Sequence, residues 1–272
     1  MSIKTAVIGH PISHSKSPLI HNFWIKQHGL TGTYDAVDIP CEELEAGIKS
    51  IINQGYIGFN VTLPHKVSIM DLCDEVDDLA RSIGAVNTVT IKDGQLLGTN
   101  TDAFGFIENI KQNAPTFDFT KGKAVVLGAG GAANAIIYAL LQEGVTEIVI
   151  SNRTRAKAEK LQELDPQKIK IADWEARHDT LVHANIIINT TALGMISSPP
   201  LEIDLDLAPS DALVTDIVYA PLMTDLLQQA QDQGLKTVTG IGMLLHQARP
   251  GFELWHGVLP DVTEELERIV LA

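Results

Sequence analysis

The sequence contains little of what disulfide-stabilised, membrane-spanning or secreted proteins need. Only two of its 272 residues are cysteines, Cys41 and Cys73, too few for a disulfide framework or a cysteine-based metal site. No apolar run approaches the roughly 18 residues that a membrane helix requires, and the opening MSIKTAVIGHP predicts a strand rather than a secretion signal. We therefore expect a cytoplasmic protein with two reduced thiols.

Positive charge is also scarce. Lysine and arginine total 20 against 34 aspartates and glutamates, for a formal net charge of -14. Such an acidic surface repels nucleic acids and anionic membranes, so we expect neither as a partner. An anionic substrate must then be bound by a local group of donors. The remaining composition is that of an ordinary globular protein, 45% hydrophobic, and the length suits two domains.

The first hundred residues alternate between strand and helix patterns. KTAVIG is a β-branched run that predicts a strand. Ser17 and Pro18 predict the N-cap and first residue of a helix that ends at Gly29. VNTVTIKDGQLLGT predicts a hairpin that turns at Asp93-Gly94. The other predicted elements are strands at 33–39 and 56–62 and helices at 42–53 and 74–83.

A different pattern begins near residue 102. A helix at 103–112 and a polar connection at 113–122 precede a strand, a glycine-rich turn and a helix in KAVVLGAGGAANAIIYALLQEG. Four short apolar strands follow, at 147–152, 168–172, 185–191 and 213–218. Near-continuous apolar strands are buried on both faces, as in a parallel sheet. From about Gly240 the pattern is helical to the end.

The glycine-rich turn predicts a dinucleotide-binding site, because it matches G-x-G-x-x-A between a strand and a helix. Gly128 permits the tight turn, Gly130 lets a pyrophosphate approach the backbone, and Ala133 allows close helix–strand packing. The unpaired N–H groups of the helix start would face the phosphates. The alternative is a purely structural turn. The expected cofactor contacts are Gly128, Ala129, Gly130, Gly131 and Ala132.

The end of the next strand predicts NADP rather than NAD. An NAD enzyme usually has a carboxylate there to hold the ribose hydroxyls. This chain has Asn152, Arg153, Thr154, Arg155 and, nearby, Lys157. Paired arginine donors suit a 2′-phosphate. The alternative is a solvated basic helix start, but cations are unfavourable at a helix N-terminus unless an anion offsets them.

Polar residues gather where the strands of the first third end. The groups are Ser13, Ser15 and Ser17; Asn60, Thr62 and Lys66; Asn87; and Asn100, Thr101 and Asp102. Ligands of open α/β sheets collect beyond strand carboxyl ends, so these groups are expected to line one crevice. The serines suit a carboxylate, with simple helix capping by Ser17 as the alternative.

Lys66 and Asp102 are the candidate catalytic pair. Reduction of a ketone needs a polarised carbonyl oxygen and a proton, and an ammonium oriented by a carboxylate can supply both. The alternative is a structural ion pair or two solvated charges. His65 adjoins Lys66, and we expect its ring to be exposed in a turn. The histidines lack a ligand spacing, so no metal is expected.

In their order, these motifs closely resemble the shikimate dehydrogenase family. The resemblance covers essentially the whole chain and includes SHSKSP, NVTLPHK, GAVNT, NTD, GAGGAA, NRT, NTTALGM, DIVYAPLMT and GMLLHQA. The family reduces 3-dehydroshikimate to shikimate with NADPH, in the pathway to aromatic amino acids. It implies an α/β fold with a discontinuous substrate-binding domain, 1–102 and 240–272, and a Rossmann-type NADP-binding domain, 103–239, separated by a cleft.

The resemblance also assigns roles to individual residues. Lys66 and Asp102 are implied as the catalytic pair, and Ser15 and Ser17 as the carboxylate site. The groups implied to hold or line the rest of the substrate are Asn60, Thr62, Asn87, Asp102, Tyr219 and Gln247. Those implied to border the nicotinamide are Asp78, Ile217, Gly240 and Met243. The chain has Ala192 where many relatives have Ser, and Thr239 where many have Asp.

Two rival functions remain open from sequence. A quinate or quinate/shikimate dehydrogenase, using NAD or NADP, would differ around Ser15 and Ser17, because quinate has an extra hydroxyl at the carboxylate-bearing carbon. A non-catalytic NADP-sensing module would keep GAGGAA and NRTR but would need no pair such as Lys66 and Asp102. The expected assembly is a monomer or a homodimer.

Overall fold

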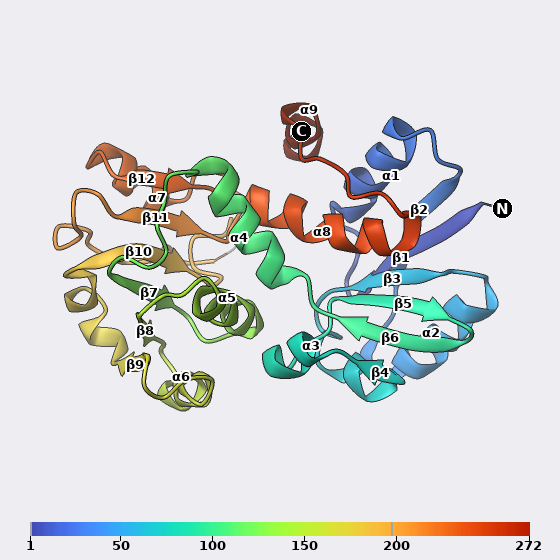
Figure 1. Cartoon of the computed structure of the whole chain (residues 1–272), viewed down its shortest axis with the longest axis horizontal. Helices are drawn as coiled ribbons and strands as arrows, with labels where there is room; N and C mark the ends of the chain where they lie inside the picture. The colour runs from blue at the N-terminus through green and yellow to red at the C-terminus, as the bar shows by residue number, and fades with distance from the viewer. Residues whose placement is uncertain (1, 197) are drawn as a thin grey trace. The chain divides into compact units, whose positions relative to one another are not determined.

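The protein divides into two compact units, each built on one six-stranded sheet. The computed structural model describes residues 2–196 and 198–272. Unit 1 contains the chain up to Gly105 together with Leu245–Ala272, and unit 2 contains Phe106–Leu244. Both units combine helices with a sheet (Figure 1), which confirms the predicted α/β class. Helices α4 (Asp102–Asn113) and α8 (Ile241–His256) run across the unit boundary.

Unit 1 contains a mixed sheet. Its strands are β1 (Ile3–Gly9), β2 (Gly32–Asp38), β3 (Gly58–Val61), β4 (Glu75–Val76), β5 (Thr88–Lys92) and β6 (Gln95–Thr99). Its other helices are α1 (Ser17–Gln27), α2 (Leu44–Asn53), α3 (Asp78–Ile83) and α9 (Glu264–Leu271), with 3₁₀ turns at Cys41–Glu43 and Ser68–Leu72. The strand order is β2-β1-β3-β5-β6-β4, in which β5 runs antiparallel to both β3 and β6.

The structure confirms some local predictions in unit 1 and corrects others. The hairpin turns at Asp93 and Gly94, whose φ angles of 53° and 81° are those that a two-residue hairpin turn requires. The helix predicted at 74–83 is wrong over its first four residues, because β4 pairs with β6 there and the Asp77 side chain caps α3 by accepting from Ala80 N. Ser17 is not an N-cap: it is already the first residue of α1.

Unit 2 contains a fully parallel sheet, as predicted. Its strands are β7 (Lys123–Leu127), β8 (Glu147–Ser151), β9 (Ile169–Ala172), β10 (Ala184–Asn189), β11 (Leu213–Asp216) and β12 (Lys236–Val238). Its helices are α5 (Gly131–Gln142), α6 (Arg155–Gln162) and α7 (Asp225–Asp232), with 3₁₀ turns at Trp174–Ala176 and Asp179–Leu181. The strand order is β12-β11-β10-β7-β8-β9. The chain leaves β7 toward β8 and β9 on one side and later returns to place β10, β11 and β12 on the other side. Nucleotides bind beyond the strand carboxyl ends at such a change in strand order.

Apolar side chains of the strands form the interior of each unit. Ile8 and Phe59 are fully buried in unit 1, as are Val125, Ile187 and Val214 in unit 2. Close packing of this kind holds the strand ends in place, and with them the polar residues that follow. The chain is not helical throughout its last part, since 257–263 separates α8 from α9. Among the described residues, none of the helices could cross a membrane.

Candidate active site

The register of the unit 1 sheet brings the polar segments next to β3, β5 and β6 together at one edge of the sheet, the edge formed by the strand ends. Thr88, at the start of β5, pairs with Asn60 of β3 and with Thr99 of β6. Because β5 runs opposite to its neighbours, its beginning lies where β3 and β6 end. The residues that leave β3 and β6, together with Asn87 before β5, therefore meet at this edge.

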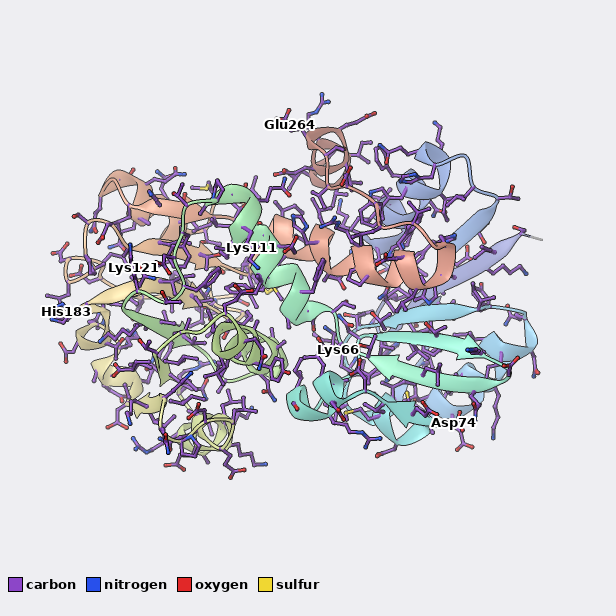
Figure 2. The ribbon with its side chains drawn as sticks, in the orientation of Figure 1. Lys66, Asp74, Lys111, Lys121, His183 and Glu264 are labelled. Atoms are coloured by element: carbon purple, nitrogen blue, oxygen red, sulfur yellow. The ribbon has the colours of Figure 1, made fainter. Side chains whose placement is uncertain are left out.

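An ion pair lies at the centre of this edge. Lys66 Nζ is 2.6 Å from Asp102 Oδ2, and Figure 2 labels Lys66 at the edge of the unit 1 sheet. Asn87 Nδ2 donates to the other carboxylate oxygen, Asp102 Oδ1, at 2.8 Å. The lysine side chain is 28% exposed and the aspartate side chain 10%. A small molecule can therefore reach the ammonium, while the carboxylate is largely enclosed.

Further predicted substrate groups join the same hydrogen-bonded set. Asn60, 5% exposed, donates through Nδ2 to the Asn87 carbonyl at 3.2 Å. Asn87 Nδ2 also lies 3.4 Å from Gln247 Oε1, on α8. Thr62 follows β3 and is partly exposed. Unit 1 thus brings Asn60, Lys66, Asn87, Asp102 and Gln247 together through direct contacts.

The two serines implied to hold a carboxylate lie at the start of α1. Ser17 is buried, and its N–H donates to Ser15 Oγ at 3.3 Å. Ser15 is half-buried, so its hydroxyl remains reachable from outside the unit. The pair therefore places two hydroxyls close together: that of Ser15, which accepts from a backbone N–H, and that of Ser17, which is engaged with Tyr34.

Sequence reasoning placed Asn100 at this site but missed Tyr34, and both help to shape it. Asn100 Oδ1 accepts from Asp102 N at 2.9 Å and so fixes the start of α4. Tyr34 Oη donates to Asn60 Oδ1 at 2.6 Å. His65 was expected to be exposed, and this is wrong: it is 1% exposed, with Nε2 2.6 Å from the Ile39 carbonyl. Strand alternation gives a signal for the burial of Tyr34 but not for its partner.

The glycine-rich turn of unit 2 has the geometry of a phosphate site. Gly128 has a φ of +110°, and a Cβ there would lie 2.6 Å from Thr190 Oγ1. A Cβ on Gly130 or Gly131 would meet no described heavy atom within 4 Å, so space remains above the turn. Gly130 caps α5 without a side-chain hydrogen bond. The N–H groups at this helix start thus suit a pyrophosphate, and the fully buried Ala133 packs as predicted.

The two arginines of the basic segment after β8 differ in their contacts. Arg155, the first residue of α6, donates through Nη1 to Asp173 Oδ1 at 2.5 Å and through Nε to Glu159 Oε1 at 3.0 Å. Arg153 is exposed, and none of the ion pairs found among the described residues includes it. Of the two guanidiniums, that of Arg155 is therefore partly neutralised, while that of Arg153 is in none of these ion pairs.

The residues implied to border a nicotinamide fall into both units. Gly240 presses against the end of β11, since a Cβ there would lie 2.5 Å from the Ile217 carbonyl carbon. Met243 is buried in the first part of α8. Tyr219, which is implied instead to line the substrate, is half-buried in unit 2, and burial raises its pKa. Asp78 is exposed at the start of α3 in unit 1. The roles of these residues toward substrate and cofactor stay predictions.

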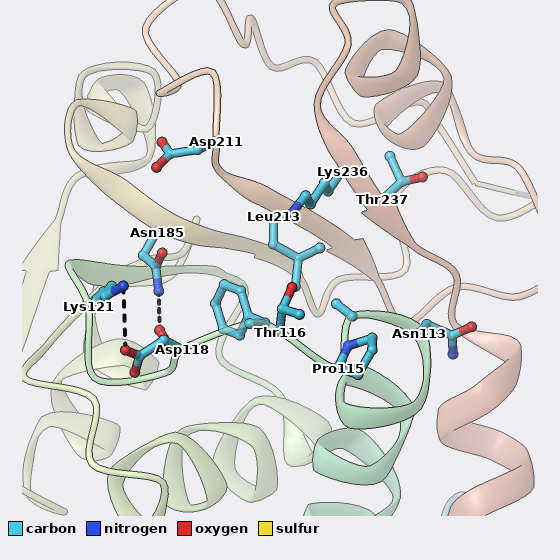
Figure 3. A pocket seen from close by; sticks show the side chains of 12 residues that line it. Asn113, Pro115, Thr116, Asp118, Lys121, Asn185, Asp211, Leu213, Lys236 and Thr237 are labelled. Carbon is cyan, nitrogen blue, oxygen red and sulfur yellow. Dashed lines mark hydrogen bonds and ion pairs between the residues drawn. The ribbon is translucent and has the colours of Figure 1, made fainter.

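A pocket of about 410 Å³ in unit 2 lies at the amino ends of the strands, away from the glycine-rich turn (Figure 3). It is lined by the amino ends of β10, β11 and β12, including Asn185, Leu213 and Lys236, and by the connection before β7. The glycine-rich turn follows the carboxyl end of β7. Because the strands are parallel, the two lie at opposite edges of the sheet. No group of metal-binding side chains was found among the described residues.

Three family models match successive parts of the chain. They describe a "Shikimate dehydrogenase substrate binding domain" at residues 7–89, "Shikimate / quinate 5-dehydrogenase" at 109–198 and a "Shikimate 5'-dehydrogenase C-terminal domain" at 240–266. The order of these matches is the order of the sequence motifs that suggested the resemblance. The models thus agree with it in the first, middle and last parts of the chain.

Individual relatives match over nearly their full length. The shikimate dehydrogenase (NADP(+)) of Rhodospirillum rubrum is 49% identical over 271 residues, 97% of this chain and 95% of the relative. The crystal structure of the Thermus thermophilus shikimate 5-dehydrogenase, in complex with NADP(H) and shikimate, has a TM-score of 0.87 at 38% identity and covers 98% of both chains. A quinate dehydrogenase from Corynebacterium glutamicum, in complex with NAD, has a TM-score of 0.92 at 30% identity and covers 99% of both. The chain therefore belongs to the shikimate dehydrogenase family.

Proposed function

We propose that this protein is an NADP-dependent oxidoreductase that reversibly reduces 3-dehydroshikimate to shikimate, in the pathway to chorismate and the aromatic amino acids. One observation carries the proposal: the Lys66–Asp102 pair, 2.6 Å apart, is braced by Asn87 and left reachable through the lysine. A binding module would need no such pair. Relatives that carry the name shikimate dehydrogenase (NADP(+)) support the choice of substrate and cofactor.

Lys66 is suited to act on the carbonyl oxygen of the substrate. Its ammonium has three N–H donors, and Asp102 Oδ2 occupies one of them. The others can polarise a ketone oxygen and supply the proton that the oxygen gains on reduction. Asp102 orients the ammonium, and its link to Asn87 keeps the carboxylate from turning away. In the reverse direction the same pair receives the hydroxyl proton.

The neighbouring polar groups suit a hydroxylated carboxylic acid. Ser15 and Ser17 would bind the carboxylate. Amide and hydroxyl groups both donate and accept, so they can hold the ring hydroxyls of either partner in the reaction. The residues proposed for that task are Thr62, Asn87, Asp102 and Gln247, with Asn60 and Tyr219 lining the substrate. Residues 1–102 with 240–272 would then form the substrate-binding domain.

Residues of unit 2 would hold NADP(H), which supplies the hydride when it is bound. The turn at 128–132 offers backbone N–H groups to the pyrophosphate. Arg153, with Asn152, Thr154, Arg155 and Lys157, would meet the 2′-phosphate. Ile217, Gly240 and Met243 would border the nicotinamide, as would Asp78 of unit 1. In this proposal 103–239 is the NADP-binding domain, and the protein works in the cytoplasm as a monomer or homodimer.

A four-way assay tests the proposed function. Purified protein is given shikimate or quinate, each with NADP or NAD, and the absorbance of reduced nicotinamide is followed. We expect the highest kcat/KM with shikimate and NADP. A higher kcat/KM for quinate with NAD would assign the protein to the quinate dehydrogenases instead. Binding of NADP without turnover of either acid would favour the sensing module.

A further inference from the structure

A continuous chain of buried hydrogen bonds leads from the interior of unit 1 to the Lys66–Asp102 pair. Tyr34 Oη donates to Asn60 Oδ1 at 2.6 Å, and Asn60 Nδ2 donates to Thr88 Oγ1 at 3.0 Å. Thr88 Oγ1 donates to Asn87 Oδ1 at 2.9 Å, and Asn87 Nδ2 donates to Asp102 Oδ1 at 2.8 Å. The first four residues are at most 5% exposed.

The direction of each bond follows from the donors at the two ends. Burial raises the pKa of Tyr34 well above its usual value, so the phenol keeps its proton and donates to Asn60 Oδ1. The amide of Asn60 then faces Thr88 with its N–H group. The single Thr88 proton goes on to Asn87 Oδ1. A flip of the Asn60 amide would set its Oδ1 against the Asn87 carbonyl, to which Nδ2 now donates at 3.2 Å.

Asn87 is the point at which this chain meets the catalytic pair. Its Oδ1 accepts from Thr88 Oγ1 and also from Thr101 N, at 2.9 Å each. With both lone pairs of the oxygen in use, only Nδ2 can point toward Asp102. Thr101 Oγ1 also lies 3.1 Å from Asn87 Oδ1. Without the Thr88 hydroxyl, the amide keeps its contacts with Thr101 but loses its link to Asn60 and Tyr34. Asn87 can then move relative to the Asp102 carboxylate that orients Lys66.

We propose that Thr88 is a positioning residue of this site, which acts with Tyr34 through the side-chain amides of Asn60 and Asn87 to hold Asp102 and Lys66 in place. The inference rests on the proposed function, because Asn60 and Asn87 are also proposed substrate groups. Thr88 itself is fully buried, so it is expected to act through its neighbours. Its substitution should change the chemistry more than the stability, because the neighbouring backbone ladder of β5 is untouched.

The chain offers a matched control for each of the two substituted hydroxyls, that of Thr88 and that of Tyr34. Thr90 lies two residues further along β5, and its Oγ1 is buried with no hydrogen-bond partner in the described structure. Thr90→Val therefore makes the same chemical change on the same strand without cutting a link. Tyr56 Oη donates to Asp35 Oδ2 at 2.8 Å, outside the network, so Tyr56→Phe is the control for Tyr34→Phe.

The kinetic test compares Thr88→Val, Thr88→Ser and Thr90→Val with the wild-type enzyme. We expect Thr88→Val to lower kcat with shikimate about tenfold or more, and to move the midpoint of the pH–kcat profile, with the KM for NADP unchanged. Thr88→Ser should recover to within about threefold, because it keeps the hydroxyl. Thr90→Val should stay within about twofold. Tyr34→Phe should lower kcat while Tyr56→Phe does not.

A second measurement separates this inference from the proposed function. In ¹⁵N-labelled protein without substrate, the side-chain amide signal of Asn87 should shift and exchange faster in Thr88→Val but not in Thr90→Val. If wild-type protein turns over neither acid, the function fails, and this signal still tests the network. Equal kcat in Thr88→Val and Thr90→Val, or an unchanged Asn87 signal, overturns the proposal. Thr88→Ala replaces Thr88→Val if valine prevents folding.

Discussion

The candidate sites at the strand ends of the two sheets are built from different chemical groups. In unit 1 the edge is made of side chains: Lys66, Asn87 and Asp102 are joined by hydrogen bonds of 2.6 and 2.8 Å. In unit 2 the edge is made of backbone: Gly128 has a φ of +110°, and Gly130 caps α5 with no side chain of its own. One edge places reactive groups, and the other leaves room and N–H donors for a ligand.

This difference predicts how each unit responds to substitution. A side-chain site loses its chemistry when one group is removed, while the backbone around it keeps its shape. A backbone site keeps its chemistry but loses affinity when a methyl group fills its space. We therefore expect changes in unit 1 to act mainly on kcat, and changes in unit 2 to act mainly on the binding of the cofactor.

The largest effect is expected from Lys66→Ala. The variant lacks the donor that polarises the carbonyl and supplies its proton, so kcat should fall by roughly 10³-fold or more. The dissociation constant for NADP, measured by fluorescence titration, should stay at the wild-type value because the glycine-rich turn is unchanged. Lys49→Ala is the control: its pair with Glu45 is exposed, and its removal should change neither quantity. Near-normal turnover of Lys66→Ala contradicts the assignment.

The second prediction concerns acid stability, which side chains of unit 1 should limit. His246 is 4% exposed, and burial, with the charge of Arg249, lowers its pKa from 6.5 to about 4. Since the folded-state pKa is the lower one, the stability present above pH 6.5 is lost as the pH falls toward 4. The difference between these pKa values corresponds to about 3 kcal/mol at most.

Urea unfolding at pH 7 and pH 4.5 checks this prediction. His246→Gln cannot take up the proton, so it should lose less unfolding free energy over this interval than the wild type. His14→Gln, at an exposed position, should follow the wild type. If His246→Gln loses as much stability as the wild type, the burial of His246 does not govern the acid limb.

Two glycines of unit 2 give the third prediction. Gly130→Ala should fold normally, because φ is -94° and no described atom lies within 4 Å of the new methyl group. It should raise the Kd for NADP on the order of 30-fold, because the methyl group keeps the pyrophosphate from the N–H donors. Gly128→Ala should instead lower the Tm by roughly 5 °C or more, through strain at positive φ. Unchanged NADP affinity in Gly130→Ala would place the pyrophosphate elsewhere.

The parts of the fold that sequence predicted are those with local causes. Asp93-Gly94 specifies its own turn, and the apolar strands of unit 2 specify burial on both faces. The parts that it missed depend on distant partners. β4 forms because β6 offers a free edge to Glu75–Val76, and β12 is a three-residue strand, Lys236–Val238, with little apolar pattern of its own.

The same division holds within the candidate site. Polar residues at strand ends and the order of the motifs identified Lys66 and Asp102, because both signals lie along the chain. Alternation along the strands cannot say which buried hydroxyl meets which amide. Thr88 and Thr90 are equivalent by pattern, yet Thr88 Oγ1 joins the network while Thr90 Oγ1 has no hydrogen-bond partner among the described residues. The orientation of the His65 ring likewise depends on a contact with the Ile39 carbonyl, 26 residues earlier in the chain.

The smallest effect is expected within the basic segment, and it tests whether unit 2 also uses side chains to select its ligand. Arg153→Ala should raise the KM for NADP about tenfold and leave the KM for NAD unchanged, because only NADP has the 2′-phosphate. Arg155→Ala should raise it less, because Asp173 and Glu159 already engage that guanidinium. An equal rise for both cofactors in Arg153→Ala would mean that the residue shapes the turn rather than reading the phosphate. The backbone edge would then bind NADP and NAD alike, and the preference would have to come from Lys157 or Thr154.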